Sequence, residues 1–208
     1  MIGDDDLFYA LCQRFFQLSF VLFFRMRVWG VERVPSKGGV VLAANHQSFL
    51  DPPAVGLALP RQVCYLARRS LFRLRPVAWL LLGMHGVPVE REGVDAGAVR
   101  RVVRLLRAGR GLVLFPEGTR TRDGSVGPFR PGFAVLASLA RVPVVPVAID
   151  GAFEAWPRER RLPRPGRLKV AYGEPLPPPT GGRVAREEFA RLVRERVLAL
   201  KEHLASME

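Results

Sequence analysis

Residues 39–53 read GVVLAANHQSFLDPP, and this stretch decides the fold class. The short apolar run at 39–44 is rich in β-branched residues and predicts a buried strand. The paired prolines that follow predict a helix over residues 52–59, with Asp51 as its N-cap. Ligands of open α/β sheets bind beyond the carboxyl ends of strands, so the pattern predicts that His46 lies at the functional edge of a sheet.

Short apolar runs and helical patterns continue to alternate along the chain. We expect strands over residues 63–67, 87–90, 111–115, 144–149 and 168–172, and helices over residues 70–82, 95–108, 132–140 and about 184–204. The helix over 95–108 has the clearest signal, because Val99, Val102 and Leu106 recur at helical spacing between an Asp95 N-cap and Gly109. The alternation predicts a layered α/β domain over residues 29–208, with a largely parallel or mixed sheet flanked by helices.

Length and composition narrow the classes of function. A chain of 208 residues corresponds to one domain, and 49% hydrophobic residues exclude a disordered protein. The net charge of +13 implies an anionic partner: nucleic acid, an acidic membrane surface or a phosphorylated substrate. Two cysteines without CxxC spacing and three scattered histidines indicate neither a disulfide framework nor a structural metal site.

The N-terminal stretch at residues 7–24, LFYALCQRFFQLSFVLFF, is almost entirely apolar. Three polar residues, Gln13, Arg14 and Gln17, fall on one face of a helix, and three aspartates precede it where a secretory signal would carry basic residues. We therefore predict a membrane-associating amphipathic helix over residues 1–28, with its apolar side toward acyl chains. An ordinary core helix and a membrane span are the alternatives.

His46 and Asp51 form the first candidate for chemistry. A histidine accepts a proton near neutral pH, and a carboxylate bonded to its other ring nitrogen fixes the tautomer and stabilises the imidazolium. The five-residue separation suits a turn leading into a helix start. The alternative is that Asp51 only caps the helix and His46 only packs.

The second candidate is the segment FPEGTRTRDG at residues 115–124, which also follows a predicted strand directly. Its glycine, hydroxyls and arginines offer donors for a phosphate, and Glu117 is placed to orient an arginine or a substrate hydroxyl. The segment lacks the spacing of a Walker loop. The alternative is a polar turn whose charges face water.

Together these motifs resemble those of the glycerolipid acyltransferase family, in which an NHxxxxD block and an FPEGTR block each follow a strand. Three further segments fit the family pattern: PVER at 88–91, VPVAI at 145–149, and RPG at 164–166 followed by GEP at 173–175. The resemblance covers roughly Trp29 to Leu204.

The resemblance implies an activity. The enzyme would move a fatty acyl group from acyl-CoA or acyl carrier protein to the free hydroxyl of 1-acyl-glycerol 3-phosphate, making phosphatidate. His46 would be the general base and Asp51 its partner, and no covalent acyl-enzyme, metal or cofactor would be needed. The acceptor would be bound by Glu117, Gly118, Thr119, Arg120 and Arg91.

The resemblance also implies partners and a location. The enzyme would work on an anionic membrane surface, at the cytoplasmic face of the inner membrane, as a peripheral or monotopic protein. Another lysophospholipid, a lyso-aminolipid or glycerol 3-phosphate are alternative acceptors, and a non-catalytic membrane-binding or nucleic-acid-binding protein is the alternative of another class. Aromatic residues gather near the N-terminus rather than among the arginines, so we expect no nucleic-acid partner.

Overall fold

The computed structural model describes residues 14, 17–73, 75, 78, 86–89 and 96–207. Its centre is a sheet of strands in the order β1-β7-β6-β2-β5-β3-β4. The strands are β1 (Arg27–Trp29), β2 (Val40–Ala44), β3 (Val63–Arg68), β4 (Gly86–Val89), β5 (Gly111–Leu114), β6 (Val144–Asp150) and β7 (Lys169–Tyr172). All neighbours pair parallel except β6 and β7. The predicted mixed, largely parallel sheet is therefore confirmed.

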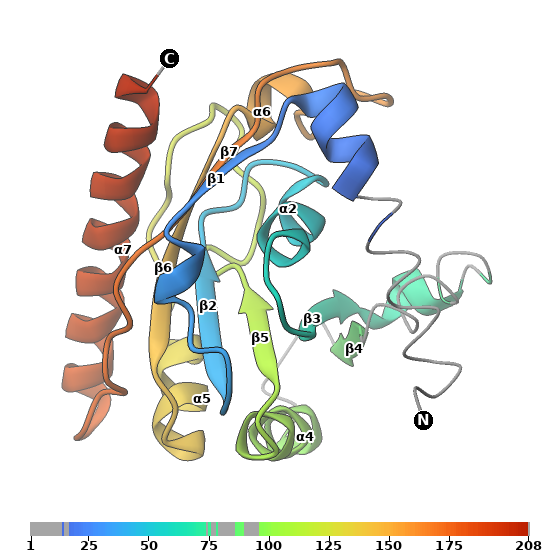
Figure 1. Ribbon diagram of the computed structural model, residues 1–208. Coiled ribbons are helices and arrows are strands. Elements are labelled where there is room, and N and C mark those ends of the chain that lie inside the picture. The colour runs from blue at the N-terminus through green and yellow to red at the C-terminus, as the bar shows by residue number, and fades with distance from the viewer. Residues whose placement is uncertain are drawn as a thin grey trace.

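Helices cover both faces of this sheet. They are α2 (Asp51–Leu57), α4 (Ala96–Arg107), α5 (Gly132–Ala140), α6 (Ala152–Ala155) and α7 (Arg183–Ser206), with 3-10 turns at Val31–Arg33 and Arg69–Arg73 and a helix at residues 17–24. In Figure 1, α4, α5 and α7 lie on one side, and α2 and the helix at 17–24 lie on the other.

The core explains why β2 reads as a continuous apolar run. Val41 and Ala43 pack into the cluster with α4, α5 and α7, whereas Val40 and Leu42 pack into the cluster with α2 and the helix at 17–24. All five residues of the strand are buried. A strand buried on both faces needs apolar side chains at every position, not only at alternate ones.

Some elements differ from the prediction. The strand β1, the turn Val31–Arg33 and the helix α6 were not predicted. The predicted helix over 70–82 opens with the 3-10 turn Arg69–Arg73, and most of its remainder lies outside the described residues, as does the Asp95 N-cap. Residues 7–13, 15 and 16 of the predicted N-terminal helix also lie outside them.

In the helix at 17–24, one of the three polar residues of the predicted polar face contacts the protein. Gln17 donates a hydrogen bond to the carbonyl of Leu57 in α2, at 2.5 Å, so it faces the protein rather than lipid headgroups. Phe20 and Phe24 are buried in the core. Within the described part of the chain, no helix combines the length and apolar character needed to cross a bilayer.

The central strands bring three loops to one edge of the sheet. β2 pairs in parallel register with β5 on one side and β6 on the other. Their carboxyl ends therefore meet, and the segments that begin at Asn45, Phe115 and Gly151 all start there. This is the edge at which α/β sheets bind ligands.

Candidate active site

His46 and Asp51 form a close pair at this edge. The Nδ1 atom of His46 lies 2.7 Å from Oδ2 of Asp51. The Asp51 side chain is fully buried, whereas 20% of the His46 side chain is exposed. With Nδ1 committed to the carboxylate, proton exchange with a substrate falls to the other ring nitrogen, Nε2.

Asp51 is not the N-cap of α2, which corrects the prediction. Leu50 occupies the cap position without a side-chain hydrogen bond, and Asp51 is the first helical residue. Its Oδ2 instead turns back and accepts hydrogen bonds from the backbone N–H groups of Gln47 and Ser48, each at 2.6 Å. Burial raises the pKa of Asp51, and the bonds from His46 and these two amides oppose that rise. The carboxylate thus holds the loop and the histidine together.

Neighbours of His46 fix this loop to the sheet. The Asn45 amide donates to the carbonyl of Ile149 at 2.9 Å and accepts from its N–H at 2.8 Å, so the loop is bound to the end of β6. Gln47 donates to the carbonyl of Gly124 at 3.0 Å. The Ser48 hydroxyl donates to the carbonyl of Trp156 at 2.7 Å. His46 therefore has little freedom to move.

Glu117 joins the two motifs through the backbone. Its Oε1 accepts from the N–H of His46 at 2.7 Å, and its Oε2 accepts from the N–H of Gly127 at 2.9 Å. Burial raises the pKa of this carboxyl. Both oxygens already have backbone donors, so the geometry makes Glu117 a positioning residue; that it also binds substrate stays a prediction.

The next three residues of the motif form a turn at the surface. Gly118 adopts φ 72°, a left-handed conformation that favours glycine, and its N–H donates to the carbonyl of Phe115 at 3.0 Å. Thr119 is exposed. The Arg120 guanidinium lies 3.5 Å from the centre of the Phe49 ring, a cation–π contact. Phe49 in turn contacts Trp156, with ring centres 5.2 Å apart.

Several functional residues were not predicted individually. Phe115 stacks on the His46 ring, with centres 4.1 Å apart and planes 18° apart. The Phe49 ring packs against the Arg120 guanidinium, and Asn45 binds the loop at residues 45–50, here called the catalytic loop, to Ile149. Asn45 and Phe115 stand inside the quoted motifs, but the pairing of Phe49 with Arg120 has no signal in the sequence because 71 positions separate them.

Arg91, the remaining predicted site residue, lies outside the described residues, so its role stays a prediction. Among the residues that the structure describes, no three His, Cys, Asp or Glu side chains are grouped where they could hold a metal ion. Cys64 is buried in the core, where burial raises the pKa of its thiol. A buried thiol of this kind behaves as a small apolar side chain.

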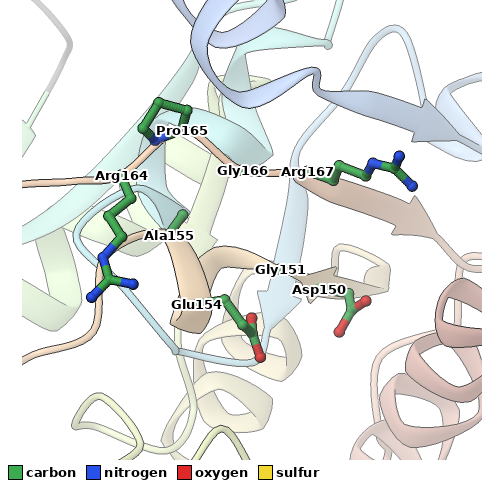
Figure 2. A pocket seen from close by; sticks show the side chains of 8 residues that line it. All are labelled: Asp150, Gly151, Glu154, Ala155, Arg164, Pro165, Gly166 and Arg167. Atoms are coloured by element: carbon green, nitrogen blue, oxygen red, sulfur yellow. The ribbon is translucent and has the colours of Figure 1, made fainter.

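A cavity of about 420 Å³ lies next to this site, beyond the end of β6. Its lining residues are Asp150, Gly151, Glu154, Ala155, Arg164, Pro165, Gly166 and Arg167. In the view of Figure 2 the Glu154 carboxylate lies between the Arg164 guanidinium and the Asp150 carboxylate. Asp150 also pairs with Lys201 at 3.0 Å. The cavity walls therefore carry both signs of charge.

Comparison with known proteins agrees with this geometry. The family model described as Acyltransferase matches residues 25–150. A 1-acyl-sn-glycerol-3-phosphate acyltransferase of Bacillus subtilis is 29% identical over 94% of this chain and 92% of its own length. The mouse 1-acyl-sn-glycerol-3-phosphate acyltransferase alpha is 32% identical over 74% of this chain and 54% of its own length.

A solved structure supports the same relationship. The 1-acyl-sn-glycerophosphate acyltransferase PlsC of Thermotoga maritima superposes with a TM-score of 0.80 at 30% sequence identity, covering 95% of this chain and 80% of that chain. The matched family region contains both the His46–Asp51 pair and the Glu117 turn that fixes it. The chain belongs to the acyltransferase family.

Proposed function

We propose that this enzyme transfers a fatty acyl group from a thioester donor to the free hydroxyl of 1-acyl-glycerol 3-phosphate, making phosphatidate. The observation that carries the proposal is the 2.7 Å contact between His46 and the buried Asp51. The acceptor is proposed because the relatives in bacteria, plants and mouse are 1-acyl-sn-glycerol-3-phosphate acyltransferases. The donor is acyl-CoA or acyl carrier protein, and the reaction as written needs no cofactor.

The proposed mechanism uses His46 as a general base. Nε2 takes the proton of the acceptor hydroxyl as its oxygen attacks the thioester carbonyl. The tetrahedral intermediate collapses, the carbon–sulfur bond breaks, and the imidazolium returns the proton to the departing thiolate. Asp51 stabilises the imidazolium through Nδ1–H, and stacking on Phe115 keeps the ring plane fixed. The acceptor oxygen is itself the nucleophile, so no acyl-enzyme forms.

Arg120 is the proposed ligand of the acceptor's phosphate. A guanidinium binds phosphate through two parallel hydrogen bonds, and the Phe49 ring holds its plane in place. Gly118 and Thr119 lie on the same turn. Arg91 is also proposed to bind the acceptor, because the PVER segment at 88–91 resembles the family pattern. The proposal gives Glu117 an indirect part, through the backbone of His46 and Gly127.

The enzyme is further proposed to sit on an anionic membrane, at the cytoplasmic face of the inner membrane, as a peripheral or monotopic protein. The helix at 17–24 supports this, because Leu18, Val21, Leu22 and Phe23 are each more than half exposed. They share one stretch of two turns while Phe20 and Phe24 anchor the helix in the core. The exposed Arg14 and Arg25 flank this apolar face, an arrangement typical of an interfacial helix.

The test is release of free thiol from acyl-CoA by purified protein, measured against a panel of acceptors. The panel contains 1-acyl-glycerol 3-phosphate, glycerol 3-phosphate, a lysophospholipid without a terminal phosphate, and a lyso-aminolipid. We expect release to depend on acceptor and to be fastest with 1-acyl-glycerol 3-phosphate. Equal release with and without every acceptor would refute acyl transfer, and a faster alternative acceptor would reassign the substrate.

A further inference from the structure

Residues 157–167, PRERRLPRPGR, form an arginine-rich loop between α6 and β7, here called the arginine loop. It contains five arginines and one glutamate. Its tip carries Leu162, which is 74% exposed and the most exposed large apolar side chain in the described part of the chain. Leucine so fully in water, between arginines, has no role in the core.

The arginine loop is anchored at both ends of its tip. The Trp156 indole N–H donates to the carbonyl of Arg160 at 3.0 Å, and the N–H of Arg160 donates to the carbonyl of Pro157 at 3.2 Å. On the returning side, the N–H of Arg164 donates to the carbonyl of Ala155 at 2.8 Å. Hydrogen bonds on both sides therefore hold the backbone that carries the exposed Leu162 in place.

The loop lies beside the end of the helix at 17–24. The N–H of Gly166 donates to the carbonyl of Phe23 at 3.3 Å, and the N–H of Leu168 donates to the carbonyl of Phe24 at 2.8 Å. Figure 1 shows the two segments together at the carboxyl edge of the sheet, on the opposite end of the molecule from α4. The arginine loop, with its exposed Leu162, and the exposed apolar face of the helix at 17–24 thus lie side by side although they are distant in sequence.

We propose that the arginine loop is a second membrane-docking element, which inserts Leu162 below the headgroups of an anionic bilayer while Arg158 and Arg161 bind lipid phosphates. The occupant follows from the exposed Leu162 among arginines, next to the exposed apolar face of the helix at 17–24, because apolar and basic side chains together are what bind a peripheral element to an anionic bilayer. The inference rests on the membrane part of the proposed function and adds where a second contact is made.

Docking at this point serves the active site directly. Trp156, the residue before the loop, accepts the hydrogen bond of Ser48 and contacts Phe49, the ring beneath Arg120. The catalytic loop, Trp156, the arginine loop and the helix at 17–24 therefore form one continuous chain of contacts. A bilayer held by the last two would present a lysolipid headgroup beside Arg120.

The test is flotation with vesicles, one set containing phosphatidylglycerol and one of phosphatidylcholine alone. We expect Leu162→Ser to weaken binding about tenfold to both sets, because the lost term is apolar burial. We expect Arg158→Ala/Arg161→Ala to weaken binding about 25-fold to the anionic set only, from about fivefold per cation.

Matched controls come from elsewhere on the surface. Val184 at the start of α7 is 65% exposed, and Arg100 and Arg101 on α4 are both exposed. Val184→Ser and Arg100→Ala/Arg101→Ala should leave vesicle binding within twofold of wild type. Equal losses from the control and loop variants would overturn the proposal, because the overall charge or hydropathy of the protein surface would then explain vesicle binding.

Activity on a short-chain, water-soluble lysophosphatidate separates this inference from the proposed function. All loop variants should retain wild-type turnover on that acceptor. Unchanged vesicle binding together with retained turnover would overturn the docking role alone, whereas an inactive wild-type protein would refute the proposed function. A higher KM for acyl carrier protein in Arg158→Ala/Arg161→Ala, with vesicle binding unchanged, would make the loop a donor-docking surface and overturn the proposal.

Discussion

At the scale of single residues, the buried carboxylate of Asp51 organises the catalytic loop. One oxygen, Oδ2, accepts from His46 and from two backbone amides. Asp51→Asn keeps an oxygen that can accept from the amides but replaces the charge that stabilises the imidazolium. We expect kcat to fall about 10²–10⁴-fold, with a small change in Tm because the side chain keeps its size. A large loss of Tm with kcat preserved would contradict this assignment.

Glu117 offers a sharper distinction, because positioning and substrate binding predict different kinetics. Glu117→Gln places an amide N–H against a backbone donor, either that of His46 or that of Gly127. We expect kcat to fall, the acceptor KM to stay within twofold, and stability to fall by about 1.5–3 kcal/mol. Glu188→Gln, at an exposed position of α7, is the control. A raised acceptor KM with unchanged kcat would instead place Glu117 on the substrate.

Arg120 is the residue proposed to bind the phosphate of the acceptor. Arg120→Lys keeps the charge but removes the planar fork and much of the stacking on Phe49. The KM for the lysophosphatidate acceptor should rise about tenfold or more, while the KM for the acyl donor changes little. Arg100→Lys, on α4, provides the control. Unchanged KM values for both substrates would move the phosphate to Arg91, Arg122 or Arg130.

At the scale of elements, the helix at 17–24 has one face that packs in the core and one exposed apolar face that is proposed to contact the membrane. Phe20 and Phe24 belong to the core, so deletion of residues 1–27 would remove core side chains and part of β1 together with any membrane contact. The exposed pair Leu22 and Phe23 can be changed without that damage. Leu22→Ser/Phe23→Ser should weaken vesicle binding by about tenfold or more and preserve turnover on a water-soluble acceptor. Equal loss on both would assign the whole helix to the core.

Elements were predictable where one local signal decides them. α5 matches its predicted bounds, Gly132–Ala140, and β2 is the apolar run at 39–44 shortened by one residue. The strand β1 was missed because Arg27–Trp29 is only three residues long and reads as the flank of the preceding helix. Helical spacing places Gln17 on the polar face of its helix but does not say on which side of the helix the protein lies, and the structure turns Gln17 toward Leu57.

In the site, as in the fold, the sequence predicted what local spacing decides and not what long-range contacts decide. Spacing and position after a strand identified His46 and Asp51, and the structure brings them within hydrogen-bonding distance. The direction of the Asp51 carboxylate was not predictable, because Asp before Pro-Pro also suits a helix cap. The hydrogen bond from the His46 N–H to Glu117 was not predictable, because the two residues are 71 positions apart and only the pairing of strands in the sheet brings them together.

At the scale of the whole molecule, the candidate site exists because the parallel strands β2, β5 and β6 end at the same edge of the sheet. β2, β5 and β6 deliver the catalytic loop, the Glu117 turn and Trp156 to one edge, and the exposed apolar surfaces of residues 17–24 and 157–167 lie at that same edge. A net charge of +13 favours an anionic surface for the whole protein. The proposed chemistry and the proposed membrane contact thus lie at the same end of the sheet.

The most direct test of this account is the turnover of His46→Ala in acceptor-dependent thiol release. The measurement uses acyl-CoA with 1-acyl-glycerol 3-phosphate, alongside circular dichroism and Tm to establish folding. General-base catalysis by His46 predicts a kcat lower by about 10²–10⁴-fold, with the fold retained because the His46 ring is partly exposed. A folded His46→Ala protein that turns over at the wild-type rate would contradict general-base catalysis by the His46–Asp51 pair.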